Sequence, residues 1–430
     1  MTVRQRLHWM TLHGVIRALT TVGARRGDLQ GRLIADPAAR ANPGEFADEI
    51  RAQGRLARAR AAWLTADHAV VHQVLRSDDF AVTSSGNSLP AFLGLIEERL
   101  RPRGRIHPLL PPSLLSVEPP DHTRYRRTVS SVFTARAVTA LEERIESAAV
   151  ALVDELDGEA DVVDIVDRYC SRLPVTVIGD ILGVPERDRS KILQFGELAA
   201  PSLDVGLSWP QYVRVEEGLT SFTQWLTDHI RELRASPGDD LMSQLIDATD
   251  EGTRLDDSEL LATAGLVLAA GFETTVNLLG SGIELLLRHP DQLDLLRERP
   301  DLWPNAVEEI LRLESPVQLT ARIAVQDNDV AGHTVRAGDA VVLYLAGANR
   351  NPGVFPNPHL FDVTRDNAGR HLSFSGGRHF CLGAALARSE GAVGLRTFFD
   401  RHPHPALAGE GRRRDTRVLR GWATLPIKIA

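Results

Sequence analysis

The sequence predicts a large, mainly α-helical fold with small β-sheets, and three observations support this prediction. Apolar residues recur at helical spacing, with acidic residues between them, over residues 137–157 and 212–236. A further segment, residues 256–289, is long and helical in pattern, with a single charged residue between Leu260 and Ile283. Later in the chain, residues 320–326 and 333–346 alternate or run with Val, Leu and Ala, which is typical of short strands.

The remaining elements follow the same division. Residues 301–313 predict another helix, and residues 55–66 and 415–429 predict further strands. Residues 84–120 are rich in Pro, Gly and Arg and predict a long loop, which in a compact protein is usually functional or mobile. The β elements therefore belong to both ends of the sequence, around a large helical region.

Composition excludes several classes of protein. Of the 430 residues, 43% are hydrophobic and 25% are charged, as in ordinary globular chains, so collagen-like, fibrous and disordered classes are excluded. Two cysteines cannot form a disulfide scaffold or a Cys-rich zinc module, and they indicate a reducing compartment. A net charge of -8 argues against nucleic acid as the main partner.

Two stretches are apolar enough to be considered as membrane or targeting segments. Residues 8–22 are interrupted by His8, His13 and Arg17, and no small-residue cleavage site follows, so we do not expect a signal peptide. The other stretch lies within residues 256–289 and suits a buried core helix better, as argued below. We expect no integral membrane segment and a cytoplasmic location.

The strongest chemical signal is the segment 371–388, HLSFSGGRHFCLGAALAR. It has the order F-x-x-G-x-x-x-C-x-G, given by Phe374, Gly377, Cys381 and Gly383. Glycines before the cysteine allow a tight turn. The cysteine then stands at a helix N-terminus, where the helix dipole and free N–H groups stabilise a thiolate and lower its pKa. Such a thiolate is a nucleophile or a metal ligand.

The long helix has one unusual feature. Asp256 and Glu259 predict a capping box at its start, and between Leu260 and Ile283 the only charged residue is Glu273. A helix that is apolar all round is a membrane span or the core of a large protein, and its polar and glycine residues favour the core. One acid in a buried helix is energetically costly and therefore needs a reason.

The segment 371–388 closely resembles the haem-ligand loop of the cytochromes P450, in particular the soluble bacterial type. The resemblance implies that Cys381 is the proximal thiolate ligand of a haem b, with Phe374 and Gly383 beside the cofactor. The other cysteine, Cys170, lies in a helical pattern and is expected to be a buried core residue.

The long helix matches the same family through its A-G-x-[D/E]-T-T stretch, residues 270–275. The resemblance implies that small residues at Ala270 and Gly271 let oxygen lie against the backbone. It also implies that Thr274, on the face of Ala270, organises the water that delivers protons to dioxygen, and that Glu273 carries protons inward. The alternative is a plain core helix in which the threonine bonds to its own backbone.

Two further sets of residues match the family. Glu309 and Arg312 alone would be an ordinary surface pair, but by resemblance they lie under the haem and are completed by Arg350. The family more often has Asp where this chain has Asn351. A second set is implied to bind the two haem propionates, and it comprises His122, Arg126, Arg322 and His379. Any single histidine among 14 would otherwise be a surface or core residue.

The resemblance extends from about residue 40 to the end of the chain, and several segments are most similar to a group found in mycobacteria. It predicts a cytochrome P450 domain over residues 41–430, with a large α-rich region and a small β-rich region around a buried haem. Residues 1–40 are expected to be an N-terminal helical extension, and the sequence assigns them no role.

The implied function is a haem-thiolate mono-oxygenase that inserts one oxygen atom of O2 into an apolar organic substrate. Electrons are expected from a separate ferredoxin and its reductase, because two cysteines cannot build an iron–sulfur cluster and the chain has no flavin module. We expect a monomer. The alternatives are a peroxide-using haem enzyme, a non-enzymatic haem carrier or gas sensor, and a hydrolase with Cys381 as nucleophile.

The sequence also predicts which segments line the substrate pocket. Leu, Val, Phe92 and Trp422 among them indicate an apolar substrate, with sterol, fatty acid, polyketide and terpenoid all open. The predicted lining comprises residues 84–116, residues 195–210, Leu266, Ala270, Thr274, Val317–Thr320 and Gly421–Ala423.

Overall fold

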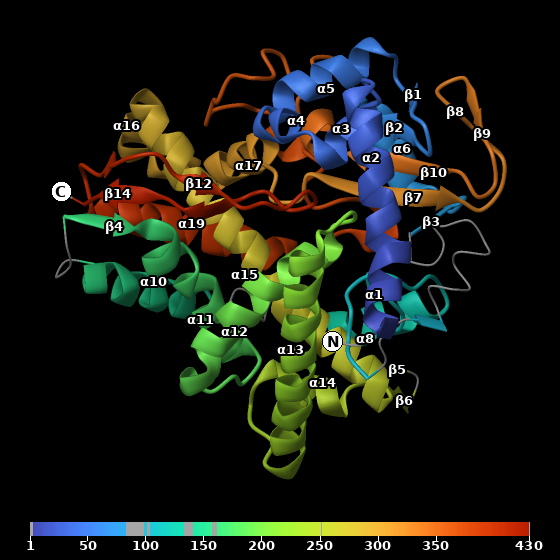
Figure 1. Ribbon diagram of the computed structural model, residues 1–430. Helices are drawn as coiled ribbons and strands as arrows, with labels where there is room; N and C mark the ends of the chain where they lie inside the picture. Colours follow the sequence, from blue (N-terminus) through green and yellow to red (C-terminus); the bar gives the residue numbers. More distant parts are fainter. Residues whose placement is uncertain are drawn as a thin grey trace.

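A broad helical region stands beside a smaller β-rich region in the computed structural model (Figure 1). The structure describes residues 3–82, 99–100, 104–132, 141–156, 161–250 and 252–429. The predicted fold class, mainly α with small β-sheets, is therefore confirmed.

Helices make up most of the described chain. The N-terminal part contains α1 (Val3–Trp9), the π-helical turn η1 (Met10–Gly14), α2 (Val15–Arg25), α3 (Leu29–Ala35), α4 (Pro37–Ala41), α5 (Pro43–Ala52) and α6 (His68–Arg76). The middle contains α8 (Asp121–Val132), α10 (Glu142–Leu156), η2 (Val166–Cys170), α11 (Arg172–Ile181), α12 (Glu186–Ala199), η3 (Ala200–Leu203), α13 (Trp209–Ala235), α14 (Leu241–Asp247) and α15 (Asp257–Arg288). The C-terminal part contains α16 (Pro290–Glu298), η4 (Pro300–Leu302), α17 (Trp303–Leu313), α18 (Leu345–Ala348), η5 (Ala368–Arg370), η6 (Gly377–His379) and α19 (Ala384–Arg401).

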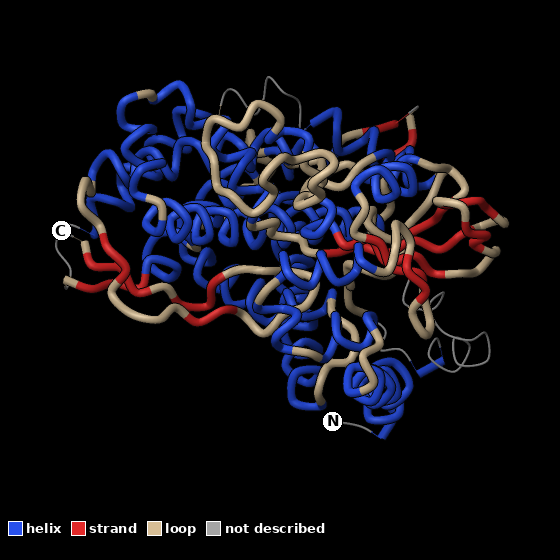
Figure 2. The backbone as a smooth tube through the Cα atoms, turned by 90° about the horizontal axis from the view of Figure 1, so that it is seen from above, coloured by secondary structure: helices blue, strands red, loops and turns tan. Residues whose placement is uncertain are grey.

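The main sheet has five strands in the order β1-β2-β10-β7-β3 and lies at one end of the molecule (Figure 2). Only the pair of β2 and β10 is parallel, with Leu64 opposite Val342. Its strands are β1 (Ala57–Arg58), β2 (Trp63–Thr65), β3 (Phe80–Val82), β7 (Leu319–Ala324) and β10 (Ala340–Tyr344).

Four smaller sheets complete the β structure, and they pair in the orders β11-β14-β4, β12-β13, β5-β6 and β8-β9. Their strands are β4 (Val162–Asp164), β5 (Thr249–Asp250), β6 (Thr253–Arg254), β8 (Asn328–Val330), β9 (His333–Val335), β11 (Ala406–Leu407), β12 (Arg412–Arg413), β13 (Trp422–Thr424) and β14 (Pro426–Lys428). The predicted strand 415–429 is thus two short strands, and the predicted strand 333–346 is β9 and β10 with the positive-φ Gly338 between them.

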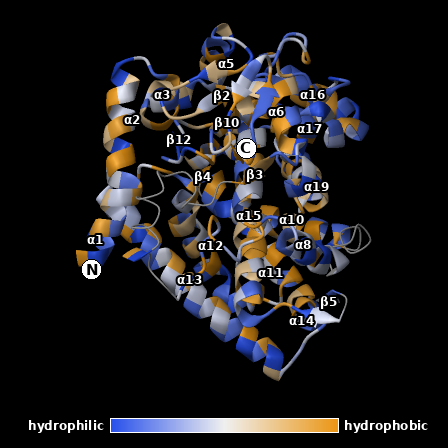
Figure 3. Ribbon diagram, turned by 90° about the vertical axis from the view of Figure 1, so that its right-hand side faces the viewer, coloured by the Kyte–Doolittle hydropathy of each residue, from blue (hydrophilic) through white to orange (hydrophobic). Residues whose placement is uncertain are grey.

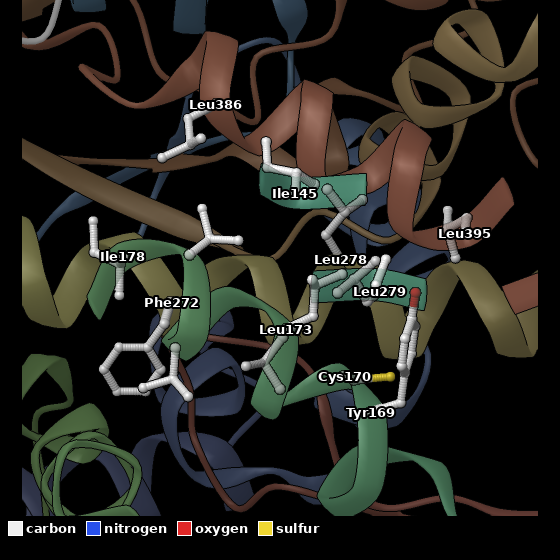
Figure 4. Packing of buried hydrophobic residues seen from close by; sticks show 14 of the residues in the cluster. Ile145, Tyr169, Cys170, Leu173, Ile178, Phe272, Leu278, Leu279, Leu386 and Leu395 are labelled. Carbon is white, nitrogen blue, oxygen red and sulfur yellow. The ribbon is translucent and has the colours of Figure 1, made fainter. Parts of the chain in front are cut away.

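The long central helix α15 organises the helical region. Asp256 and Glu259 form the predicted capping box, and α15 packs against α11, α13, α17 and α19. Among the described residues it is the one helix long and apolar enough to cross a membrane, but most of its apolar window is buried in the protein, as predicted for a core helix. Figure 4 shows Phe272, Leu278 and Leu279 of this helix within the apolar core.

The other predicted helices are observed with small shifts of their ends. The predicted helix 137–157 corresponds to α10, although residues 133–140 lie outside the described part of the chain. Cys170 is fully buried in the core next to Tyr169, as predicted (Figure 4). Because α19 packs on both α15 and α17, the segments that carry the three main motifs are fixed relative to one another.

Candidate functional site

The backbone conformation of the segment 371–383 explains why a glycine is required in its turn. Ser375 and Gly377 both adopt positive φ, of 63° and 64°. A Cβ on Gly377 would lie 2.2 Å from the carbonyl oxygen of Leu75, so only glycine fits at this position. Gly376 is extended at φ -166°, a conformation open to any residue. The N–H of Cys381 donates to the Phe374 carbonyl at 2.9 Å and closes the loop.

Cys381 stands between η6 and α19, whose N-cap is Gly383. Its side chain retains accessible surface, but protein surrounds it, and this desolvation raises the pKa of the thiol. The Gly383 N–H, Arg126 and Arg388 oppose that rise without cancelling it. The helix N-terminus therefore lowers the pKa of the thiol, as expected, but by less than burial raises it. Coordination to a metal ion deprotonates a thiol outright.

Phe374 is buried and fixes the loop through its ring. The guanidinium of Arg388 lies 4.6 Å from the ring centroid, and Phe380 meets it edge-on at 6.3 Å. Arg388 is held by Glu308 at 2.5 Å, and Glu308 also lies 3.1 Å from His371 Nε2. Although burial opposes it, bonding to His371 and then Arg388 lowers the pKa of Glu308 to about 2. Sequence reasoning missed this pair.

Glu309 and Arg312 form a fully buried ion pair beneath the loop, with N···O distances of 2.6 and 2.8 Å. Arg312 also donates to the carbonyl oxygens of Asn349, Pro358 and Leu360, at 3.0, 2.8 and 3.0 Å. Each nitrogen of the Arg312 guanidinium therefore donates a hydrogen bond within the protein. This pair is a structural brace and not a surface contact.

The third member of the brace is Arg365, whose Nε lies 3.1 Å from Glu309 Oε1. The expectation that Arg350 completes the pair is wrong. Arg350 lies 3.7 Å from Glu314, a different buried acid that also binds Arg420 at 2.9 Å. Nothing in the local pattern around residue 365 distinguished this arginine from the other arginines of the chain.

Asn349 connects the end of the main sheet to the loop. Its side-chain NH2 donates to the hydroxyls of Ser315 and Ser373, both at 2.8 Å, and its Oδ1 accepts from the Leu372 N–H at 2.7 Å. Asn351, where the family more often has Asp, accepts from the Gly353 N–H at 2.9 Å and keeps its turn closed. The missing charge at residue 351 therefore leaves this turn intact.

Four cationic or donor side chains expected to bind the propionates lie in one cluster, with Arg126 beside Cys381. The rings of His122 and His379 lie 4.3 Å apart. His122 Nε2 is buried without a hydrogen-bond partner in the described chain, and His379 Nε2 lies 3.8 Å from Glu118 Oε1. Buried Arg322 donates to its neighbour Ala321 at 2.9 Å. Arg126 is half-buried and lies close enough to Cys381 for each to shift the pKa of the other.

This cluster holds more positive than negative charge. Burial, followed by repulsion from His379 and Arg126, lowers the pKa of His122 to about 4. Burial likewise lowers the pKa of Arg322 to about 10. The nearby carboxylate, Glu118, already accepts from the Val82 N–H at 2.6 Å and binds Arg378 at 2.8 Å. The cluster is therefore suited to an additional anion.

The middle of α15 has one face that does not pack against protein. Ala270 is exposed and Thr274 half-exposed, in a helix whose other faces are mostly buried. The Thr274 hydroxyl donates to the Ala270 carbonyl at 3.0 Å, which is the structural alternative considered for this residue. The oxygen keeps lone pairs that can accept a hydrogen bond on the accessible face.

Glu273 points elsewhere, into the protein. It is 5% exposed, and its Oε1 lies 3.0 Å from Arg414 Nη1. Burial raises the pKa of Glu273 even though Arg414 opposes the rise. Arg414 in turn lies 4.0 Å from the exposed Glu197. Arg414 is far from Glu273 in sequence, so no local motif could have identified it.

The predicted pocket lining is only partly described. Phe92 lies outside the described residues. Trp422 belongs to the apolar core, where Arg413 stacks on its ring at 3.7 Å, and the expectation that it lines the pocket is wrong. The reason is that Gly411 leaves room for this ring, since a Cβ there would lie 2.7 Å from it, while β13 packs against α15.

The donor set fits a haem. A haem needs an axial ligand and buried cations for two carboxylates. Cys381 offers an accessible sulfur at a helix N-terminus. The ring nitrogens of His122 and His379, with Arg126 and Arg322 beside them, offer donors in a region where positive charge exceeds negative charge.

Comparison with known proteins gives close relatives. The family model of cytochrome P450 matches residues 202–301 and 301–405. Cytochrome P450 140 of Mycobacterium bovis and of Mycobacterium tuberculosis is 60% identical over 430 residues, which is 99% of this chain and 98% of the relative. The 6-deoxyerythronolide B hydroxylase of Saccharopolyspora erythraea is 40% identical over 345 residues, covering 79% of this chain and 82% of the hydroxylase.

Solved structures agree in fold. A myxobacterial cytochrome P450 in complex with myristic acid superposes with a TM-score of 0.82 at 32% identity, covering 92% of this chain and 98% of that one. P450BioI, bound to an acyl carrier protein that bears hexadec-9Z-enoic acid, gives 0.81 at 32% identity, with 91% and 100% covered. The chain belongs to the cytochrome P450 family and is a haem-thiolate mono-oxygenase.

Proposed function

We propose that the protein binds haem b through Cys381 and inserts one oxygen atom of O2 into an apolar organic substrate. The observation that carries this proposal is the accessible Cys381 sulfur beside a cluster of cationic donors that lacks a matching anion. When bound, the haem supplies the iron at which O2 is activated. Phe374 and Gly383 would contact the cofactor around the sulfur, and Ala270 would leave space on the opposite side.

The propionates would be held by His122, His379, Arg126 and Arg322. The two propionate carboxylates would supply the negative charge that this region lacks and would form charge-assisted bonds with these donors. The brace of Glu309, Arg312 and Arg365 acts indirectly, because it fixes the loop and does not contact the cofactor.

Two residues of α15 are proposed to handle protons. Thr274 would hold a water molecule through the free lone pairs of its hydroxyl, on the accessible face it shares with Ala270. Glu273, whose raised pKa favours the neutral acid, would carry protons inward. Its contact with Arg414, and through Arg414 with exposed Glu197, gives this buried acid a connection to the surface.

The surface beside the ligand loop indicates the kind of electron donor that the protein uses. A groove of about 760 Å3 lies on the outer side of the ligand loop, lined in part by His72, Arg76, Arg370 and exposed Phe380. In a protein of net charge -8, such a basic groove suits an acidic electron donor, and we propose a ferredoxin with its reductase. We further propose a cytoplasmic monomer. The relative named as a 6-deoxyerythronolide B hydroxylase and the solved structure bound to myristic acid support an apolar substrate.

The test is the spectrum of the reduced protein with carbon monoxide. The wild type should show the long-wavelength Soret band of a thiolate haem, and Cys381→Ala should abolish it. Cys170→Ala is the matched control, because that thiol is fully buried in the apolar core, and it should leave the band in place. A thiolate band in Cys381→Ala would overturn the assignment.

A further inference from the structure

The N-terminal helical segment, α1 with η1 and α2, exposes an unusual amount of apolar surface. It stands at one border of the molecule in Figure 3. Twelve large hydrophobic residues are exposed in the described chain, and half of them lie in this segment. They are Val3, Leu7, Met10, Val15, Leu19 and Val22, with exposed fractions between 41% and 77%. Isolated exposed apolar residues are ordinary, but a concentration of them marks a binding surface.

These six residues form one continuous stripe. Val3, Leu7 and Met10 follow the spacing of four and three that keeps side chains on one face of a helix, and Val15, Leu19 and Val22 repeat it. The two triplets start twelve residues apart, one more than three turns of α-helix need. The π-helical turn Met10–Gly14 is wider and absorbs that residue, so both triplets share a face.

The opposite face of the segment is attached to the protein through polar contacts. His8 Nδ1 lies 2.9 Å from the Tyr212 hydroxyl, and Trp9 donates to the Leu207 carbonyl at 3.0 Å. His13 is buried, and that burial lowers its pKa to about 3, so it is neutral. Rotation of the helix to bury the stripe would break these contacts and expose the buried histidines. The apolar stripe is therefore held outward.

Charge distinguishes this segment from the rest of the molecule. Residues 1–27 contain five arginines and no Asp or Glu, whereas the whole chain has a net charge of -8. All five arginines, Arg4, Arg6, Arg17, Arg25 and Arg26, are exposed. A helix with an apolar face and arginine-rich flanks is typical of segments that lie in the interface of an anionic membrane.

We propose that α1, η1 and α2 form a peripheral lipid-binding helix that places its apolar stripe in an anionic membrane surface. A second copy of the chain is a poorer occupant, because pairing two such stripes would bring two sets of five arginines together. Anionic lipid headgroups attract the same arginines while the acyl region accepts the stripe. The proposal concerns this surface alone and does not depend on the haem chemistry.

Vesicle co-sedimentation with the full-length haem protein tests the proposal. Vesicles of phosphatidylcholine alone are compared with vesicles that also contain phosphatidylglycerol, at low and high salt. We expect binding to the anionic vesicles and weaker binding at high salt, because salt screens the arginines. The triple variant Leu7→Gln, Met10→Gln, Leu19→Gln should lose about tenfold or more in partition, since its apolar insertion is removed.

Two further variants separate the contributions. Arg25→Gln with Arg26→Gln should weaken binding to anionic vesicles by about fivefold per arginine. Val325→Gln with Leu360→Gln replaces equally exposed apolar residues elsewhere, at 56% and 54% exposure, and should bind like the wild type. The proposal would be overturned if the wild-type protein bound neutral and anionic vesicles equally. It would also be overturned if the triple variant bound anionic vesicles as well as the wild type does. A wild-type dimer that the triple variant converts to monomer without any vesicle binding would likewise overturn it, because the occupant would then be a second copy.

Discussion

The region beneath the ligand loop and the middle of α15 treat buried charge in opposite ways. Beneath the loop, Glu309 is paired with both Arg312 and Arg365, and Glu308 with His371 and Arg388. On α15, by contrast, Glu273 has an elevated pKa despite its contact with Arg414. The ion pairs of the first region fix the conformation of the ligand loop. The second region contains Glu273, an acid that can exist in either protonation state.

The contrast follows from how completely each side chain is satisfied. A buried ion pair is stabilising only when further hydrogen bonds satisfy both partners, and Arg312 obtains three of them from backbone carbonyls. Those carbonyls belong to Asn349, Pro358 and Leu360, in segments that lead into the ligand loop. Glu273 has one cation and no such set of donors, so the cost of burial remains and favours its neutral form.

The largest effect is expected for Arg312→Ala. It leaves Glu309 buried without its main partner and the carbonyls of Asn349 and Pro358 without their donor. We expect a cost of about 3–5 kcal/mol, with lower haem loading and a lower thermal midpoint. Arg350→Ala is the matched control, since Glu314 keeps Arg420 and Arg413 in that variant. Haem content per chain after expression measures the difference. Full haem loading in Arg312→Ala would show that the brace does not support the loop.

Glu308 predicts a pH dependence of stability on the loop side. Its pKa in the folded protein is about 2, below the ordinary value of 4.5. The stabilisation is therefore fully present above about pH 4.5 and is lost as the pH falls toward 2. At about 1.4 kcal/mol per pKa unit, a fall from 4.5 to about 2 amounts to about 3.5 kcal/mol at most.

The variant Glu308→Gln lacks this titration, so its deficit in unfolding free energy should be constant at neutral pH and shrink on acidification. Urea unfolding at a series of pH values measures it. A deficit that stays constant down to pH 3 would show that the contacts of ionised Glu308 with His371 and Arg388 do not stabilise the fold.

The sequence predicts the loop side of this comparison better than the α15 side, for a physical reason. The loop, the capping box of α15 and the pair Glu309–Arg312 are local, with members a few residues apart, so spacing alone identifies them. Arg365 and Arg414 reach their acids only through the tertiary fold, and spacing cannot rank them among the many arginines. The size and apolar character of Trp422 suggest a pocket residue, but Gly411, distant in the local pattern, gives its ring room in the core.

A smaller effect is expected for the cationic cluster of His122, Arg126, Arg322 and His379. Arg322→Ala and Arg126→Ala should each weaken haem retention by about 1–3 kcal/mol, the worth of a lost charge-assisted bond, without preventing folding. The rate of haem transfer to an excess of apomyoglobin measures retention. Arg58→Ala, which removes a partly exposed arginine of the main sheet, is the control. Unchanged transfer rates in both cluster variants would remove these arginines from the proposed propionate site.

The smallest change in binding, with the clearest change in chemistry, is expected for Thr274→Ala. The substitution removes a hydroxyl from the accessible face of α15 and leaves the neighbouring apolar surface in place. Ligand-induced shifts of the Soret band should therefore give dissociation constants within a few-fold of wild type, since a methyl-sized contact is worth about 1 kcal/mol. Turnover should nevertheless become uncoupled, with NADPH consumed and hydrogen peroxide released in place of product, because protons arrive without the water that Thr274 positions.

Thr275→Ala is the matched control for this prediction. Its hydroxyl also donates to the backbone of α15, to Gly271 at 3.3 Å, but the side chain is buried on another face. It should keep electrons coupled to product, whereas Glu273→Gln should slow turnover without releasing more peroxide, because proton supply falls while the water site survives. The measurement compares NADPH consumed, peroxide released and product formed with a surrogate ferredoxin system. If Thr274→Ala couples as well as Thr275→Ala does, protons reach the site by another route, and the division of labour between the two regions is not the one proposed.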